Sequence, residues 1–215
     1  MDRSNADLTR AEKKRLQIRM AAKVLFLRSG FQGTSTDAIA TEASVSKETL
    51  YRYYASKEDL FVDVVRSLTT ERLNLSQWTE QSPGPTSEAD LRMRLLDIAR
   101  QVLETMVQSE YQAIARLMLA ELPRFPELGP LFRATVPKPA TNAFLTLLHQ
   151  GQAHGVVRQS LDLPLIGRIF FSTLLSYGVL DGLLSQTPTP QMPEASVIET
   201  FVDQIMELVA VSQGG

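Results

Sequence analysis

A short stretch of the chain leaves cationic, hydroxyl and aromatic side chains outside the positions that helical spacing would bury. Between Gly30 and Phe61, Leu50 and Tyr54 lie four residues apart and would form the buried side of one short helix. The side chains that then point outward are those of Lys47, Thr49, Tyr51, Arg52 and Tyr53. Groups of this kind contact phosphates and base edges in protein–DNA complexes. The pattern therefore favours binding to DNA.

Catalytic chemistry has little support in the sequence. The histidines are His149 and His154, and a spacing of five on a helix separates them by about 140° around the axis, so they cannot share a metal ion. The chain has no cysteine, no Gly-x-Ser-x-Gly elbow, no P-loop and no Gly-x-Gly-x-x-Gly after a strand. We therefore expect no catalytic residue, no metal and no cofactor, and a protein that is not an enzyme.

Short helices must position the outward side chains. The capping box Thr9-x-x-Glu12 predicts a first helix that ends at Ser29, before Gly30. Three further helix starts fall within 21 residues and are expected to be capped by Thr36, Ser46 and Ser56. The helices that begin at Thr36 and Ser46 are too short to be stable alone, so they must pack on their neighbours.

The rest of the chain also predicts helices, because no segment sustains the alternation that marks a half-buried strand. The helix capped by Ser56 is expected to reach Trp78, and Ser87-x-x-Asp90 begins another. Pro137 and Pro139 predict a break or kink within residues 128–152. Residues 163–184 are apolar almost all round, which is typical of a buried helix. We expect an all-α protein of about nine helices.

The charge is unevenly distributed. The whole chain has a net charge of −2, but residues 1–57 carry 11 Lys and Arg against 6 Asp and Glu. A basic N-terminal quarter on an acidic body indicates that one end meets a polyanion. The N-terminus lacks the apolar core of a signal peptide, and the longest apolar stretch, Ile169 to Leu180, is too short to span a bilayer. We expect a cytoplasmic protein with no membrane partner.

The stretch from Gly30 to Phe61 closely resembles the helix-turn-helix of the TetR family, the tetracycline-repressor-like regulators. The matching residues are Gly30-Phe31, Thr34-Ser35, Ile39-Ala40, Ala43, Val45-Ser46, Thr49-Leu50-Tyr51, Tyr53-Tyr54 and Ser56-Lys57-Glu58-x-Leu60-Phe61, preceded by Ala21-Ala22 and Leu25-Phe26. Arg19 stands where the family often has an aliphatic residue. Tyr54 replaces the commoner Phe, so its hydroxyl needs a hydrogen-bond partner.

The resemblance implies which residues contact DNA. They are Thr36, Ser46, Lys47, Thr49, Tyr51, Arg52, Tyr53 and Lys57. Residues 46–49 would enter the major groove at the start of the recognition helix. The two tyrosines would meet the backbone or a thymine methyl, and Thr36 and Lys57 would meet phosphates. Arg52 either contacts DNA or pairs with an acidic neighbour.

The C-terminal part resembles the AefR-like branch of this family more loosely, through the run Arg116–Phe132, Gly155 and Val157-Arg158. There the domain is a helical bundle with an internal ligand pocket, and its last two helices form a four-helix dimer interface. The resemblance implies a helix-turn-helix domain over residues 1–60 and an effector-binding and dimerisation domain over residues 61–215. It also implies a homodimeric repressor that binds a palindromic operator in double-stranded DNA and is released by a small, largely hydrophobic effector.

Candidate residues follow for the pocket and for the interface. Side chains of the middle helices that could line a pocket are Met106, Tyr111, Ile114, Arg116, Met118, Phe144, His149 and Phe170. Aromatic and methionine residues at this spacing equally fit an ordinary core, and Arg116 could pair with Glu121 or another acid instead of a ligand. Apolar residues that would form the dimer interface are Phe171, Leu174, Ile198, Phe201, Val202, Ile205 and Leu208.

Two other classes of protein are alternatives. An enzyme would need catalytic motifs that the sequence does not carry. A ligand-carrying helical bundle or adaptor that does not bind DNA would leave the outward side chains of Lys47, Thr49 and Tyr51 unexplained. A gel shift with DNA at low salt separates these classes from a DNA-binding regulator.

Overall fold

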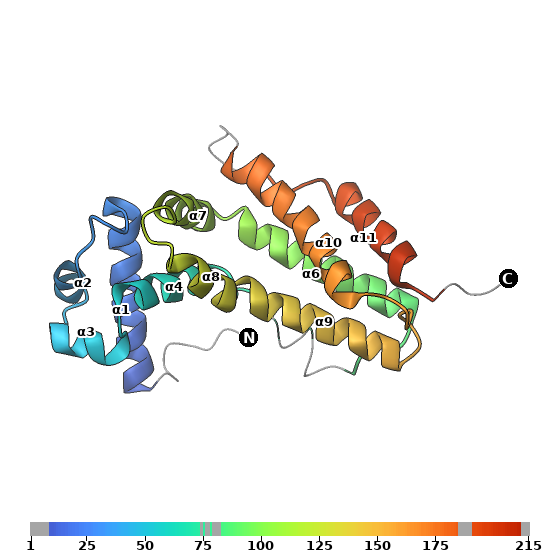
Figure 1. Ribbon diagram of the computed structural model, residues 1–215, viewed down its shortest axis with the longest axis horizontal. Helices are drawn as coiled ribbons and strands as arrows, with labels where there is room; N and C mark the ends of the chain where they lie inside the picture. The colour runs from blue at the N-terminus through green and yellow to red at the C-terminus, as the bar shows by residue number, and fades with distance from the viewer. Residues whose placement is uncertain (1–8, 74, 76–77, 79–82, 185–190, 212–215) are drawn as a thin grey trace. The chain divides into compact units, whose positions relative to one another are not determined.

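The structure is a computed structural model that describes residues 9–73, 75, 78, 83–184 and 191–211. Regular secondary structure among these residues is helical (Figure 1), apart from one isolated antiparallel bridge between Val157 and Ala210. The predicted all-α fold is confirmed. Three prolines at residues 186–193 also predict a loop, which lies largely outside the described residues.

The helices follow in chain order as α1 (Arg10–Ser29), α2 (Thr36–Glu42), α3 (Lys47–Tyr53), α4 (Lys57–Leu68), α6 (Glu88–Met106), α7 (Ser109–Glu121), α8 (Leu128–Thr135), α9 (Pro137–Ala153), α10 (Leu163–Ser176), the π-helix η1 (Tyr177–Leu183) and α11 (Ala195–Val209). They form two compact units. The first comprises Met1–Ser67 and Ala113–Thr135, and the second comprises Leu68–Gln112 and Val136–Gly215.

Aromatic packing holds the first unit together. The rings of Phe26 on α1, Phe31 after it and Phe61 on α4 lie with centroids 5.1–5.6 Å apart, and all three are fully buried. Phe125, between α7 and α8, packs on Phe31 at 4.9 Å. Gly30 ends α1 with a φ of +73°, which glycine adopts without strain. The later part of α7 and all of α8 therefore fold with the helix-turn-helix segment.

The second unit is a bundle in which α6 packs against α11 and α9 against α10 (Figure 1). Its core includes Leu91 and Leu95 of α6, Phe144 of α9 and Phe170 of α10, all fully buried. The predicted break at the prolines is present, since α8 ends at Thr135 and α9 begins at Pro137. Proline is tolerated at this first helical position because its missing N–H would have no partner there.

Two predictions about helices are wrong. The fourth helix ends at Leu68, not at Trp78. The segment Leu163–Leu183 is not buried all round, because only 33% of its most apolar window is buried. Leu165, Leu175 and Leu180 are 52%, 48% and 59% exposed. By length and composition alone this segment could cross a membrane, as core helices of other proteins also could.

Candidate DNA-binding surface

Serine side chains set the starts of the two short helices. Ser46 caps α3 as predicted, because its Oγ accepts the N–H of Thr49 at 3.1 Å. For α2 the prediction is wrong by one residue: Ser35 has the extended backbone of a cap, and its Oγ accepts the N–H of Ala38 at 3.1 Å. Thr36 is instead the first helical residue, and its hydroxyl lies 3.4 Å from that of Tyr51 on α3.

The turn between α2 and α3 is tied to the preceding helices. Ser44 adopts a positive φ of 49°, and the next N–H, that of Val45, bonds to the carbonyl of Ala40 at 2.9 Å. The side chain of Gln17 on α1 donates to the carbonyl of Ala43 at 2.6 Å. These bonds fix the direction in which α3 leaves the turn.

The α3 helix buries one side and presents the other. Leu50 is fully buried and Tyr54 is 3% exposed, as the spacing predicts. Every residue implied as a DNA contact is exposed or half-buried, and Tyr51 is 46% exposed. The predicted side chains are therefore available to a ligand, and they come from α2, the cap of α3, α3 itself and the first turn of α4.

The three cations among the implied contacts also have partners within the chain. Lys47 pairs with Asp37 of α2 at 2.8 Å, and the hydrogen bond to this carboxylate raises the pKa of Lys47. The guanidinium of Arg52 lies 5.6 Å from the ring centroid of Tyr53. Lys57 donates to the carbonyls of Phe31 and Thr34 at 2.9 and 3.1 Å. Lys57 thus stabilises the connection between α1 and α2, independently of any contact with DNA.

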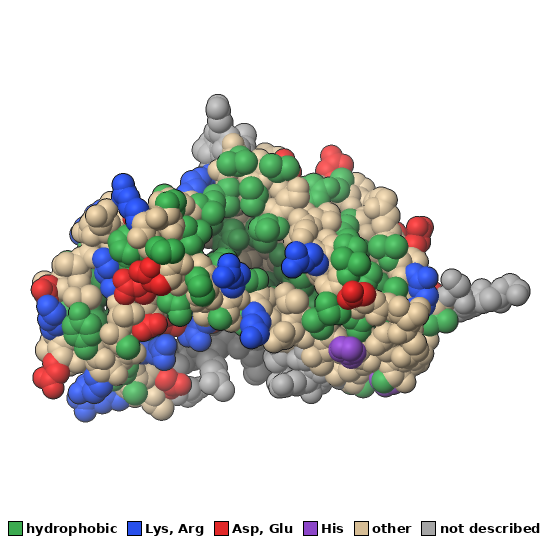
Figure 2. Space-filling model, in the orientation of Figure 1, with side chains coloured by type: hydrophobic (Ala, Val, Ile, Leu, Met, Phe, Trp, Pro, Cys, Tyr) green, Lys and Arg blue, Asp and Glu red, His purple; other side chains and the backbone are tan. Residues whose placement is uncertain are grey.

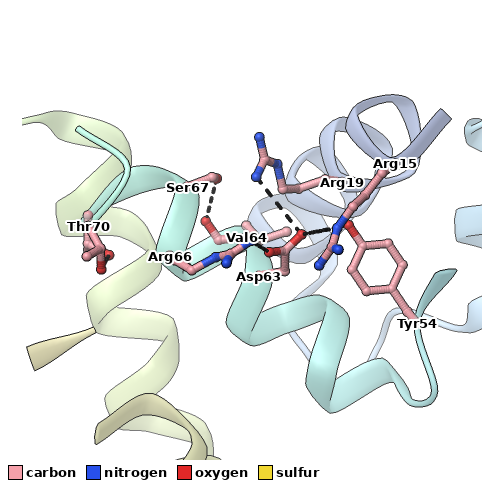
Figure 3. Close-up of polar contacts among 9 residues, drawn as sticks. Arg15, Arg19, Tyr54, Asp63, Val64, Arg66, Ser67 and Thr70 are labelled. Carbon is pink, nitrogen blue, oxygen red and sulfur yellow. Dashed lines mark hydrogen bonds and ion pairs between the residues drawn. The ribbon is translucent and has the colours of Figure 1, made fainter. Parts of the chain in front are cut away.

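A carboxylate beneath this surface links three elements (Figure 3). Asp63 of α4 is 5% exposed and accepts the hydroxyl of Tyr54 at 2.6 Å and the Nε of Arg15 at 3.4 Å. It also pairs with Arg66 of α4 and lies 4.0 Å from Arg19 of α1. The carboxylate of Asp63 is therefore the partner that the hydroxyl of Tyr54 needs. Arg19 lies near the same carboxylate.

The charge state of this cluster follows from its surroundings. Burial disfavours the ionised form of Asp63, but the hydrogen bond from Tyr54 and the positive charges of Arg66, Arg15 and Arg19 outweigh it and hold the pKa of Asp63 below its usual 3.8. Burial and the bond to Asp63 raise the pKa of Tyr54 far above its usual value. The cluster is thus an ionised acid bonded to a neutral phenol at neutral pH.

Sequence analysis missed two groups of residues at this surface. It did not connect Asp63 with Tyr54 and Arg15, because the acid lies 48 residues from that arginine. It also gave no role to Arg10 and Lys14 of α1, which line a hollow beside α3. The basic excess of residues 1–57 was a signal for these two cations, but charge counts do not locate side chains.

The implied pocket residues are divided between the two units. Met106, Tyr111, Phe144, His149 and Phe170 belong to the second unit, and Ile114, Arg116 and Met118 belong to the first. Phe144 and Phe170 stack in the core with ring centroids 4.7 Å apart, and Ile114 and Met118 are buried. Tyr111 and Met106 are half-buried, whereas Arg116 and His149 are exposed. A groove of about 880 Å³ on α6, lined by Trp78, Met93 and Arg92 among others, includes none of these eight residues.

Some of the implied dimer residues are buried within their own unit, and others are partly or well exposed. Leu174, Ile198, Val202 and Ile205 are at most 4% exposed and pack in the core of their own unit. Phe171 and Phe201 are half-buried against Phe170, and Leu208 is 43% exposed. Further exposed apolar residues lie on α10 and η1, along which Figure 2 shows apolar side chains. Among the described residues, no group of three or more acidic or histidine side chains could hold a metal ion.

Comparisons with known proteins agree with this arrangement. Residues 18–64 match the family described as bacterial regulatory proteins, tetR family, and residues 93–207 match the AefR-like transcriptional repressor, C-terminal domain. The chain is 26% identical over 164 residues to the uncharacterized HTH-type transcriptional regulator YdeS of Bacillus subtilis, covering 73% of this chain and 76% of YdeS.

Solved structures show the same fold. The flavonoid-responsive regulator FrrA matches with a TM-score of 0.67 and 29% identity over 93% of this chain and 98% of FrrA. A TetR transcriptional regulator from Agrobacterium tumefaciens matches with a TM-score of 0.74 and 18% identity over 93% of this chain and 96% of its own.

Proposed function

The chain belongs to the TetR family of transcriptional regulators, and from this membership we propose that it is a repressor that occupies a palindromic operator until a small effector releases it. One observation carries the proposal. The α3 helix buries Leu50 and Tyr54 and leaves Lys47, Thr49 and Tyr51 on an open surface. Cationic, hydroxyl and aromatic side chains on such a face are suited to contact phosphates and base edges when a recognition helix enters the major groove.

We assign DNA binding to residues 1–60, and effector binding and dimerisation to residues 61–215. We propose that the protein acts in the cytoplasm. Part of this second segment, Ala113–Thr135, is compact with the first unit. The chain passes from one unit to the other within α4, within α7 and again between α8 and α9. These three connections are therefore the covalent routes by which effector binding could change the DNA-binding surface. The coupling required is typically about 1–3 kcal/mol.

The proposed dimer uses the apolar surface of α10 and η1. A two-fold contact is isologous, so one apolar face on each chain suffices to bury both. Leu165, Leu175, Leu180 and Leu184 are each about half exposed or more. Exposed apolar side chains grouped on one segment are typical of an interaction surface. Two-fold symmetry in the protein then implies a palindromic operator with half-sites about one helical turn apart or somewhat more.

The proposed effector is small and largely hydrophobic. FrrA is described as flavonoid-responsive, which supports a compound with an aromatic part. Met106 and Tyr111 are half-buried and are candidate contacts for the effector. Arg116 is exposed, and we propose it as the partner of an acidic group on the effector. A screen of flavonoids and acyl compounds by thermal shift, followed by DNA release, tests this proposal. A compound that stabilises the protein without changing DNA affinity would show a pocket without a switch.

DNA binding is tested by selection of bound fragments from bacterial genomic DNA, followed by anisotropy titration with the recovered sequence. We expect Thr49→Ala to change which sequences are preferred, because its side chain lies where bases would be read. Lys47→Ala should weaken binding to all sequences and lower the salt slope by about 0.9 for each phosphate that is no longer neutralised. Arg124→Ala, in the α7–α8 connection of the same unit, is the matched control. Binding that neither variant alters would contradict the assignment of this face.

A further inference from the structure

A hollow beside α3 concentrates positive charge that the proposed recognition helix does not account for. Its volume is about 620 Å³, and it lies between the first turns of α1, the turn before α3 and α3 itself. The lining side chains include Arg10, Lys14, Ser46, Thr49, Arg52 and Tyr53. Three of them are cations and none is acidic, so the hollow suits an anion.

The three cations are not neutralised within the described part of the chain. Arg10 begins α1 and is exposed, and Lys14 donates only to the neutral side-chain oxygen of Gln17, at 2.9 Å. Arg52 lies over the ring of Tyr53 and has no carboxylate partner among the described residues. Two nearby cations differ: Lys47 pairs with Asp37, and Arg15 pairs with Asp63. The three cations that line the hollow are therefore available to an anion.

The position of the hollow identifies the anion. Ser46 and Thr49 line it and also stand at the start of the recognition helix, so a molecule in the hollow would lie directly beside DNA bound by α3. The nearest anion on a duplex is the phosphodiester group of the backbone. Lysine and arginine hold such groups by charge and hydrogen bonds, without reading the base.

We propose that this hollow binds backbone phosphate of the duplex beside the bases that α3 reads, with Arg10 and Lys14 as a sequence-independent anchor. This inference rests on the proposed binding of DNA and adds residues of α1 to the contact surface. The anchor ties the first helix to DNA, so that the recognition helix is held from two sides. Affinity then depends on α1, while sequence preference remains with α3.

The first experiment compares two double variants that remove the same charge. Arg10→Gln with Lys14→Gln empties the hollow of its α1 cations, and Lys13→Gln with Arg28→Gln removes two exposed cations of α1 that do not line it. Glutamine keeps helix propensity, so both proteins should melt as the wild type does. The first variant should bind every DNA sequence more weakly, with its salt slope lower by about 0.9 for each phosphate that the hollow no longer neutralises. Its deficit should shrink by roughly 3.5-fold for each such phosphate between 50 and 200 mM salt.

The second experiment locates the phosphate. Single methylphosphonates, which are uncharged, replace phosphates in turn across and beside the selected site. We expect the wild type to lose affinity at one or two positions where the Arg10→Gln, Lys14→Gln variant is insensitive. Equal loss in both double variants, or a changed sequence preference in the first, would overturn the anchor while leaving DNA binding by α3 intact. Wild-type protein that binds no DNA at all would overturn both the anchor and the proposed function.

Discussion

A single buried acid, Asp63, organises the polar interior of the DNA-binding unit. It accepts bonds from Tyr54 at the end of α3 and from Arg15 on α1, and it belongs to α4 (Figure 3). A buried carboxylate is stable only when paired and hydrogen-bonded. Asp63 meets this requirement with side chains from two other elements, so its removal should loosen the junction that sets the direction of α3.

The hydroxyl of Tyr54 gives a test of this role. Tyr54→Phe removes a hydrogen bond to a charged acceptor and leaves the ring in place, so the free energy of unfolding should fall by about 1.5–3 kcal/mol. The matched control is Tyr53→Phe on the adjacent, half-buried tyrosine, which should change stability little. Urea denaturation measures both. Equal stability of the two variants would show that the bond to Asp63 contributes nothing net.

The lowered pKa of Asp63 predicts a pH dependence. A group whose pKa is lowered by folding stabilises the native state above its unfolded pKa, near 3.8, and that contribution is lost as pH falls through the folded value. Asp63→Asn should therefore be less stable than the wild type at neutral pH, and the difference should shrink below about pH 4. Urea midpoints over this pH range measure it. A constant difference at all pH values would contradict an ionised Asp63.

At the scale of elements, the π-helix η1 depends on glycines. A Cβ on Gly178 would lie 2.6 Å from the sulfur of Met106, and one on Gly182 would lie 2.5 Å from Nε2 of Gln112. That Nε2 donates to the carbonyls of Met106 and Gly178 at 2.6 and 3.3 Å. π-Helical turns within helices often occur at functional sites. Here η1 also carries exposed Leu180 of the proposed dimer surface.

The close approach at Gly178 predicts a coupled pair of substitutions. Gly178→Ala should lower the free energy of unfolding by about 1–3 kcal/mol, because Met106 must move. Adding Met106→Ala makes room for the new methyl, so the double variant should lose less than the sum of the two singles. Gly129→Ala is the control, since its Cβ would meet Leu122 at an ordinary 3.5 Å. Strict additivity in urea denaturation would contradict the clash.

For the whole molecule, burial separates the core from the proposed interface. The apolar residues of α11 that the sequence assigned to a dimer, Ile198, Val202 and Ile205, are almost fully buried within one chain. Of the exposed apolar residues in this unit, several lie along α10 and η1 (Figure 2), and Leu208 of α11 is exposed as well. A test of assembly must therefore change exposed positions, because a charge in the core would unfold the unit and abolish any dimer indirectly.

Leu175→Glu with Leu180→Glu should yield a folded monomer that binds DNA weakly. These side chains are 48% and 59% exposed, so glutamate can reach water in the monomer but not in the proposed interface. Leu119→Glu, at a residue of the first unit that is 56% exposed, should remain dimeric, and Ile205→Glu should unfold. Sedimentation and circular dichroism distinguish the three. Wild-type monomer at micromolar concentration would reject the dimer.

The sequence by itself determined the features that depend on neighbours in the chain. The helix starts at Thr9, Ser46 and Ser87 rest on bonds between residues three apart, and all three are present. The buried side of α3 follows from a spacing of four. The predicted cap of α2 was wrong by only one residue, because Ser35 and Thr36 are both good helix caps. Only the backbone conformation distinguishes them.

Tertiary structure alone decided which apolar faces turn inward and which distant side chains meet. The stripe of α11 could face a partner or its own core, and only its packing against α6 places it inside. Asp63 finds Arg15 and Tyr54, and Arg10 and Lys14 reach α3, only because α1 crosses the helix-turn-helix. The physical reason is range: caps and turns bond within a few residues, whereas burial and charge pairing depend on elements that the chain brings together from far apart.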